Sequence, residues 1–346
     1  MKNSIKEEIQ KRILVLDGAM GTMLQRFDFD ENDFRGSRFK DWPTSLKGNN
    51  DLLSLTQPDA IATVHRSYFE AGADIVETNT FSGTTIAMAD YAMEELVTEL
   101  NYESAKIARE VADVFTEKEP EKPRFVAGAI GPTNKTASMS PDVNDPGFRA
   151  ITFQELRKAY KQQAEALLDG GVDVLLVETV FDTLNAKAAL FAIEEIKEER
   201  AIEIPVMVSG TITDASGRTL SGQTAEAFLI SINHLPLLSV GFNCALGAEQ
   251  LTPYLETVSS KSDFAISAYP NAGLPNAFGE YDQSPEEMAA QIKGYLERNL
   301  INIIGGCCGT TPEHIKAIAT IAKGFQPRKL PEADLQGVSA FSADSL

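Results

Sequence analysis

Short apolar segments alternate with longer amphipathic segments along almost the whole chain of 346 residues. The short runs are rich in Val, Ile and Leu, which is typical of parallel strands buried on both faces. In the longer segments apolar residues recur every three or four positions, which predicts helices with one face on a core. The predicted strands are 13–16, 74–77, 125–130, 172–178, 205–209, 237–242, 264–268 and 301–304. The predicted helices are 60–71, 86–115, 153–168, 184–198, 225–233, 249–258, 286–296 and 313–322.

About eight such repeats favour a closed (β/α)8 TIM barrel, an α/β fold, over the competing doubly wound open sheet. The length of the chain is sufficient for such a barrel, because a barrel of this kind commonly fills about 250 residues or more. We expect residues 1–325 to form the barrel. Residues 326–346 show neither a helical nor a strand period, and we interpret them as a linker.

Polar residues follow strand after strand of this pattern. In barrels the loops after the strands build the active site, so these clusters should converge at the C-terminal mouth. They lie at 17–22, 77–80, 131–134, 178–179, 210–211, 243–244, 269–273 and 307–310. Two long insertions, 25–56 and 134–150, also follow strands. We expect them to rise over the mouth as walls or lids.

The chain has three cysteines, and each lies at the exit of a predicted strand. A single free cysteine is often only a small buried apolar residue. Cys307 and Cys308, however, are adjacent between glycines, where a disulfide between them would be strained, and Cys244 holds the matching place after another strand. Three thiol ligands leave a fourth position open, the pattern of catalytic rather than structural zinc. The three histidines fall inside or at the start of helical patterns, where we expect surface or packing roles.

Three thiolates make a zinc site electron-rich, which weakens its ability to generate hydroxide from water. The same site suits a substrate thiol, because a coordinated thiol is deprotonated. The residues therefore favour alkylation or group transfer at sulfur over hydrolysis.

Two carboxylates stand at strand exits, Asp17 and Glu178. Each could hold a substrate ammonium group or act as a base. The alternatives are a turn cap for Asp17 and a buried acid paired with a base for Glu178. The turn at 18–21 could present backbone N–H groups to a carboxylate. Glu77 and Asn79 are further candidates for the lining of the mouth.

The net charge is −19, and no basic stripe offsets it, so binding to nucleic acid is disfavoured. No apolar run reaches the roughly 18 to 20 residues that a membrane span needs, and no targeting segment opens the chain. A long chain with few cysteines fits a reducing compartment, and we expect a cytoplasmic location.

These residues resemble the homocysteine S-methyltransferase family. Nearly the whole chain, from about residue 13 to about residue 330, is similar to the homocysteine-binding barrel of cobalamin-dependent methionine synthases. The matching strings are LDGAMGT at 16–22, GNND at 48–51, ETNTF at 77–81, SPDVNDP at 140–146, ETVFDTLNA at 178–186, GTITD at 210–214, NCALG at 243–247, PNAGLPN at 270–276 and GGCCGTT at 305–311.

The resemblance implies that Cys244, Cys307 and Cys308 bind zinc and that the homocysteine sulfur becomes the fourth ligand. In relatives without substrate a protein oxygen fills that position. Asn271 is our candidate here, and we count it among the residues that meet the substrate.

The resemblance also implies how homocysteine is held. Asp17 and Glu178 would bind its amino group, and backbone N–H groups near Gly18 and Ala19 would bind its carboxylate.

The methyl group, by the same resemblance, comes from methylcobalamin and ultimately from 5-methyltetrahydrofolate. The sequence has no Asp-x-His-x-x-Gly pattern for a cobalamin ligand and no Gly-x-Gly-x-x-Gly loop. We therefore expect the donor from cobalamin-carrying and folate-binding modules outside this barrel, toward which the linker would lead. Two alternatives stay open. One is a stand-alone methyltransferase that uses S-methylmethionine, S-adenosylmethionine or betaine, and the other is a non-catalytic zinc-bearing docking barrel.

Overall fold

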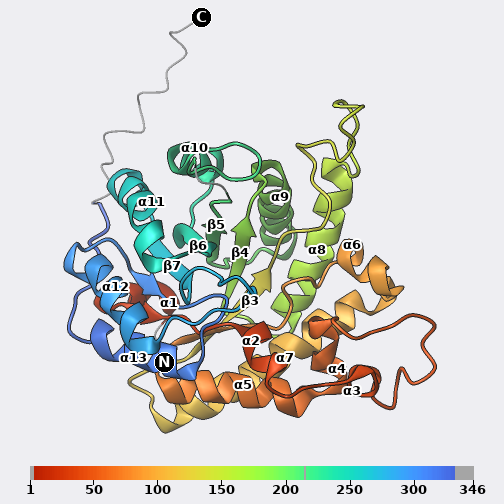
Figure 1. Cartoon of the computed structure of the whole chain (residues 1–346), viewed down its shortest axis with the longest axis horizontal. Helices are drawn as coiled ribbons and strands as arrows, with labels where there is room; N and C mark the ends of the chain where they lie inside the picture. The colour runs from red at the N-terminus through yellow and green to blue at the C-terminus, as the bar shows by residue number, and fades with distance from the viewer. Residues whose placement is uncertain (1–3, 214–215, 332–346) are drawn as a thin grey trace, which may run out of the picture.

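The computed structural model describes residues 4–213 and 216–331, and these residues form a parallel barrel with helices around it (Figure 1). Within the described residues eight strands follow one another in the order β1-β8-β7-β6-β5-β4-β3-β2, and each neighbouring pair in this order is parallel. They are β1 (Leu14–Val15), β2 (Ile75–Glu77), β3 (Phe125–Ile130), β4 (Val174–Val180), β5 (Val206–Gly210), β6 (Ser239–Gly247), β7 (Ala265–Asn271) and β8 (Ile303–Ile304). The predicted barrel is confirmed.

Backbone hydrogen bonds between the ends of this order close the barrel. The N–H of Asp74 donates to the carbonyl of Val15 at 2.7 Å, and the N–H of Asp17 donates to that of Ile75 at 3.0 Å. Leu16 also forms a parallel bridge with Ile75. Strand β1 therefore lies beside β2, and their carboxyl ends share one mouth with the other six.

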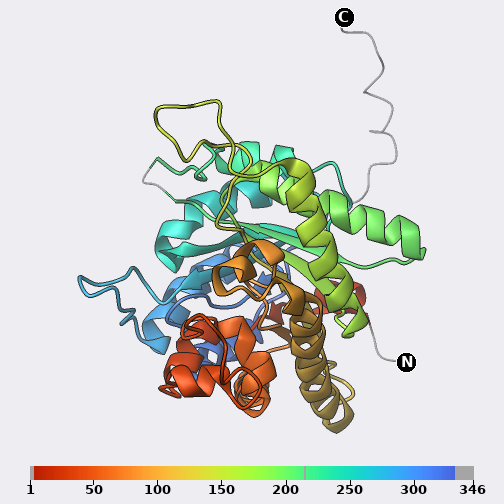
Figure 2. The same ribbon diagram turned by 90° about the vertical axis from the view of Figure 1, so that its right-hand side faces the viewer.

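The helices lie outside the strands, as Figures 1 and 2 show from two directions. They are α1 (Ile5–Lys11), α2 (Met20–Gln25), α3 (Glu31–Arg35), α4 (Leu53–Thr56), α5 (Pro58–Ala71), α6 (Thr85–Met88), α7 (Val97–Lys118), α8 (Phe153–Asp169), α9 (Thr183–Arg200), α10 (Ala225–Ile232), α11 (Ala248–Lys261), α12 (Pro285–Glu297) and α13 (Pro312–Ala322). None of the helices in the described ranges has the length and apolar character needed to cross a membrane.

The helix predicted over 86–115 is in fact broken, and this part of the prediction is wrong. Between α6 and α7 the chain makes two 3-10 turns, η2 (Ala89–Tyr91) and η3 (Glu94–Leu96). Ala92, in the left-handed region at φ 55°, ends the first turn. The carbonyl of Tyr91 accepts hydrogen bonds from Trp42 Nε1 at 2.8 Å and Thr44 Oγ1 at 3.0 Å, so a distant segment holds the break in place.

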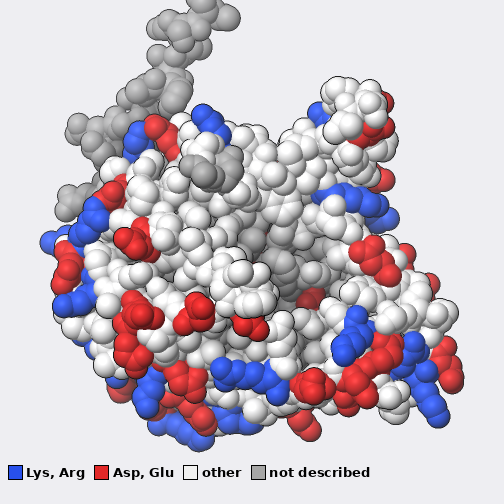
Figure 3. Space-filling view, in the orientation of Figure 1, with Lys and Arg blue, Asp and Glu red and all other residues white. Residues whose placement is uncertain are grey.

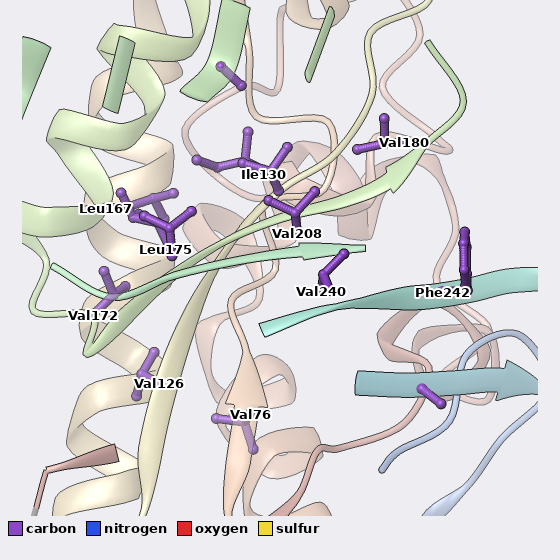
Figure 4. Packing of buried hydrophobic residues seen from close by; sticks show 14 of the residues in the cluster. Val76, Val126, Ile130, Leu167, Val172, Leu175, Val180, Val208, Val240 and Phe242 are labelled. Carbon is purple, nitrogen blue, oxygen red and sulfur yellow. The ribbon is translucent and has the colours of Figure 1, made fainter. Parts of the chain in front are cut away.

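Alternate strand residues point into the barrel or out toward the helices, which is the period of a strand. The outward set packs on the helices, as Figure 4 shows for Leu175 of β4 and Leu167 of α8. The inward set forms a separate apolar cluster, which Ile5 and Ile9 of α1 join. Its other members are Leu16, directly after β1, and the strand residues Leu14, Ile75, Phe125, Ala127, Val174, Leu176, Met207, Ala265, Tyr269 and Ile303. Apolar rows therefore fill the lower part of the barrel.

The two insertions behave differently. Residues 48–51, from the first insertion, line the cavity at the mouth. Of the second insertion, 134–150, Asn134 lines that cavity, while every residue of the stretch 141–150 is exposed and the stretch projects from the body at the upper right of Figure 1. The first insertion is thus a wall of the mouth, and most of the second is not.

The start of the predicted linker is attached to the barrel. The guanidinium of Arg328 donates to the carbonyls of Ser259, Ser262 and Phe264, and its backbone N–H donates to the carbonyl of Ile301 at 3.1 Å. Residues 332–346 lie outside the described residues.

His65 of α5 is completely buried, and neither ring nitrogen has a hydrogen-bond partner among the described residues. Burial lowers its pKa to about 4. An unfolded histidine has a pKa of about 6.5, so below that pH the unfolded chain binds a proton at His65 that the folded protein does not bind. The folded protein therefore loses stability as the pH falls from about 6.5 toward 4. We expect this residue to cost about 2 kcal/mol of stability at pH 5 relative to pH 8.

The measurement is urea unfolding of the wild type and of His65→Leu at both pH values. Because other groups also titrate, only the difference between the two proteins isolates His65. An equal loss of stability in both proteins would rule out this account.

Candidate active site

The polar floor of the mouth continues the inward rows of the barrel. Glu77 stands two residues beyond the inward Ile75, and Glu178 stands two residues beyond the inward Leu176, so strand alternation directs both carboxylates inward. Tyr269 of β7 is also inward and buried, and its hydroxyl lies 3.5 Å from Glu178 Oε2. The chain thus changes from apolar to acidic rows at the carboxyl end of the sheet.

Irregular backbone presents the functional residues of β4 and β6. The pairing register shifts within 177–180 of β4 and within 243–247 of β6. Thr179 (φ 53°), Cys244 (φ 60°) and Ala245 (φ 56°) lie in the left-handed region. A residue other than glycine held there costs of the order of 1–3 kcal/mol, and such strain and bulges gather at functional sites.

The structure brings the three cysteines together at the mouth. The Sγ atoms of Cys244 and Cys308 are 3.7 Å apart, and all three Sγ atoms lie within 4.8 Å of one another. Zinc–sulfur bonds of about 2.3 Å in a tetrahedral site place sulfurs about 3.8 Å apart, so the spacing suits zinc. Within the described residues no other group of His, Cys, Asp and Glu side chains meets this criterion.

Two backbone contacts fix the cysteine pair after β8. The N–H of Cys307 donates to the carbonyl of Pro270 at 2.8 Å, and the N–H of Cys308 donates to Asn271 Oδ1 at 3.1 Å. The pair is therefore held against the end of β7.

The thiols influence each other's ionisation. Hydrogen bonds to Cys244 and Cys308, followed by burial, raise the pKa of Cys307 well above its usual range. Hydrogen bonds from Cys244 and Cys307 lower the pKa of Cys308 to about 3. These shifts favour a thiolate at Cys308 that accepts hydrogen bonds from the thiols of Cys244 and Cys307. A divalent cation that bound all three sulfurs would displace the protons of those two thiols.

Three carboxylates beside this cluster lack a cationic partner. Burial raises the pKa of Glu77 to about 8. Burial and the nearby charge of Glu77 raise the pKa of Asp17, and burial with the charges of Glu77 and Asp17 raises that of Glu178. Since none of the three forms an ion pair within the described part of the chain, a ligand that carries a cation would relieve their repulsion.

The turn after β1 is tightly held. The N–H of Ala19 donates to Thr310 Oγ1 at 3.1 Å, and its carbonyl accepts from the Tyr68 hydroxyl at 3.0 Å. A side-chain carbon at Gly18 would lie 2.7 Å from Thr310 Oγ1, so this position excludes a larger residue. Helix α2 begins directly after Ala19, and no side chain caps it. A substrate carboxylate that accepted a hydrogen bond from the Ala19 N–H would share or replace the bond between that N–H and Thr310 Oγ1.

A cavity of about 1420 Å³ opens above these groups. Figure 3 shows this face of the molecule hollowed near its centre. Acidic groups dominate the charged residues of its lining. The acids are Asp17, Asp51, Glu77, Asp90, Glu178, Glu280, Asp282 and Glu313, and the basic residues are Arg26 and His314. The cavity is far larger than an amino acid requires and favours positively charged ligands.

Asn271 is completely buried beside the thiols. Its Oδ1 accepts from the Cys308 N–H, and its Nδ2 lies 3.3 Å from the Tyr281 hydroxyl. For Asn271 to supply an oxygen to a metal, its Oδ1 would have to share or leave the bond to Cys308. Its role as fourth ligand stays a prediction.

Asn243 and Tyr269 belong to the polar clusters 243–244 and 269–273 that the sequence pattern places at the mouth, although neither was predicted to have a specific role. The sequence does not single out Tyr281. Tyr281 lines the cavity from the segment between β7 and α12, where no periodic pattern distinguishes it. Of the histidines, His65 lies in the core, and His314 binds Thr311 and the carbonyl of Gln283 at the start of α13.

Comparison with known proteins gives one family. The family described as homocysteine S-methyltransferase matches residues 14–322. Among solved structures, the metallated form of the homocysteine methyltransferase MmuM from Escherichia coli is 23% identical, with a TM-score of 0.67 over 91% of this chain and 98% of that chain. The oxidized form of the same enzyme is 22% identical, with a TM-score of 0.68 over 89% and 95%. At this identity the two structures support the fold alone.

The fold and the cysteine cluster define a (β/α)8 barrel protein with three thiols grouped at its mouth, where they could hold a metal ion. Because the family match spans most of the chain, the protein belongs to the homocysteine S-methyltransferase family. It is therefore a methyltransferase of the class that acts on homocysteine.

Proposed function

We propose that this barrel is the homocysteine-activating module of a cobalamin-dependent methionine synthase. Cys244, Cys307 and Cys308 would hold zinc, a cation that, when bound, lowers the pKa of a substrate thiol. The cluster of three thiols beside unpaired carboxylates, at the floor of a large cavity, is the observation that carries the proposal. Asn271 would serve as the nearby oxygen ligand when substrate is absent.

The carboxylates would orient the substrate. Asp17 and Glu178 would bind the ammonium group of homocysteine, and the backbone at Gly18 and Ala19 would bind its carboxylate. With both ends held, the sulfur would point toward the cysteines and the open cavity. It would then bond to the methyl carbon of the donor, while the bond from that carbon to the donor breaks and leaves its electron pair on the donor.

The surface around the mouth supports a bulky donor. Several large apolar side chains are exposed in the loops that follow the strands, and exposed apolar groups of this kind favour contact with another module. They are Phe27, Phe81, Leu220, Leu274 and Phe278. We therefore propose methylcobalamin, brought by a cobalamin-carrying module and recharged by a folate-binding module, as the donor.

One observation favours a second candidate. The acidic lining of the cavity would attract a cationic methyl donor such as S-methylmethionine, S-adenosylmethionine or betaine. A stand-alone methyltransferase with such a donor would need no second module.

A methionine-formation assay with homocysteine and each donor separates these functions. We expect turnover with methylcobalamin, loss of turnover after a chelator removes the metal, and recovery when zinc is restored. Turnover with a sulfonium or betaine donor and none with methylcobalamin would establish the second candidate. Bound zinc whose X-ray absorption edge does not respond to homocysteine would indicate a non-catalytic docking barrel.

We further propose that residues 1–325 are the catalytic barrel and that 326–346 lead to the other modules. A reducing compartment, the cytoplasm, suits three cysteines that must stay available for metal.

A further inference from the structure

We infer that Asn243 is a positioning residue that ties the ammonium-binding strand to the metal-binding strand, and this inference rests on the proposed function. The side chain of Asn243 is completely buried in the middle of β6, where the pairing with β7 begins to shift register. It directly precedes Cys244, and its contacts reach β4, β5 and the segment after β8.

Both the oxygen and the nitrogen of the Asn243 side-chain amide contact residues outside β6. Its Oδ1 accepts from the backbone N–H of Thr179 at 3.1 Å and from Ser209 Oγ at 2.7 Å. Its Nδ2 donates to Thr179 Oγ1 at 2.8 Å and lies 3.9 Å from Cys307 Sγ, within reach of a weak hydrogen bond to sulfur. A primary amide offers two donors and two acceptor sites, so this one is fully engaged.

These contacts join the two irregular strands of the site. Thr179 follows Glu178, and Cys244 follows Asn243, while Thr179 and Cys244 both adopt positive φ. A threonine in this conformation persists only where its surroundings hold it. Asn243 binds both the N–H and the hydroxyl of Thr179, so it fixes the turn that aims Glu178 into the cavity.

The same amide touches the other end of the substrate site. Its N–H group approaches the sulfur of Cys307, where a donor stabilises a thiolate and orients it. One side chain therefore sets the distance between the carboxylate for the ammonium group and the sulfurs for the metal. A buried amide with a purely structural role would need contacts to strands, but no contact to a metal-binding thiol.

Three variants test these contacts separately. Asn243→Ala removes all of them. Thr179→Val keeps the branched shape and the strained backbone but removes the hydroxyl, so it weakens the link on the β4 side alone. Ser209→Ala removes one bond to the same amide, and among the described residues no hydrogen bond joins Ser209 directly to Glu178 or to a cysteine, so it serves as the matched control.

The readouts are zinc affinity, by competition with a chelator, and homocysteine affinity of the zinc-loaded protein, by equilibrium dialysis. Loss of a contact that orients a metal ligand typically weakens binding by about 10- to 100-fold. We expect Asn243→Ala to weaken both affinities by about ten-fold or more. Thr179→Val should weaken homocysteine binding alone, and Ser209→Ala should change neither affinity.

Lower thermal stability of Asn243→Ala with both affinities unchanged would overturn the inference. If that variant does not fold, unchanged homocysteine affinity in Thr179→Val would overturn it instead. A wild type that binds zinc but no homocysteine would contradict the proposed function, and zinc affinity of Asn243→Ala would still decide the role of Asn243.

Discussion

Replacing Cys308 by alanine should abolish zinc retention and methyl transfer while the barrel stays folded. The substitution leaves two of the three proposed thiol ligands and removes the group whose pKa is lowered to about 3, so the cluster loses its stable thiolate. Cys308 is partly exposed, and the structure of the barrel is built by strands below it. We therefore expect the free energy of unfolding to stay within about 1 kcal/mol of that of the zinc-free wild type.

Metal analysis after dialysis, circular dichroism and the methionine assay measure these three effects. Thr22→Val is a matched control, because Thr22 Oγ1 accepts from the N–H of Gly309 at 3.1 Å beside the cluster without being a metal ligand. It should keep its zinc. Stoichiometric zinc in Cys308→Ala would show that this cysteine is not a ligand.

Most of the fold follows from local sequence pattern. Runs such as 125–130 and 174–177 are apolar at every position, and the structure buries them on both faces as strands β3 and β4. The grouping of the cysteines was also predictable, because a parallel barrel places all strand exits at one mouth.

What could not be predicted depends on contacts between distant segments. The break between α6 and α7 is held by Trp42 and Thr44, about 50 residues away along the chain. The bulges of β4 and β6 depend on how two strands pair across β5, and Asn243 acts there through Thr179 and Ser209. Strand periodicity places Glu178 at the mouth and turns it inward, but it predicts neither the register shift beside it nor the positive φ of Thr179 and Cys244.

Replacing Glu178 by glutamine should raise the KM for homocysteine by about 10- to 100-fold, with little change in zinc content. The substitution preserves shape but removes the negative charge, and a hydrogen bond to a charged group contributes about 1.5–3 kcal/mol. Glu280→Gln is the matched control, because Glu280 lines the same cavity from an exposed position. It removes the same charge at a solvent-exposed position, where screening is stronger, and should change KM by less than about three-fold. Steady-state kinetics and metal analysis of both variants measure the effect, and an unchanged KM in Glu178→Gln would remove this residue from ammonium binding.

The pH dependence distinguishes a charged partner from a packing role for Glu178. Burial, together with the nearby charges of Glu77, Asp17 and Cys244, raises the pKa of Glu178 in the empty site. Ammonium binding requires the ionised carboxylate, so a falling pH protonates the free protein and raises the wild-type KM for homocysteine. Glutamine carries no titratable proton, and the variant should show a high KM with a weaker dependence on pH. If wild type and variant show parallel pH profiles, another of the three buried acids, Asp17 or Glu77, carries the charge that meets the substrate.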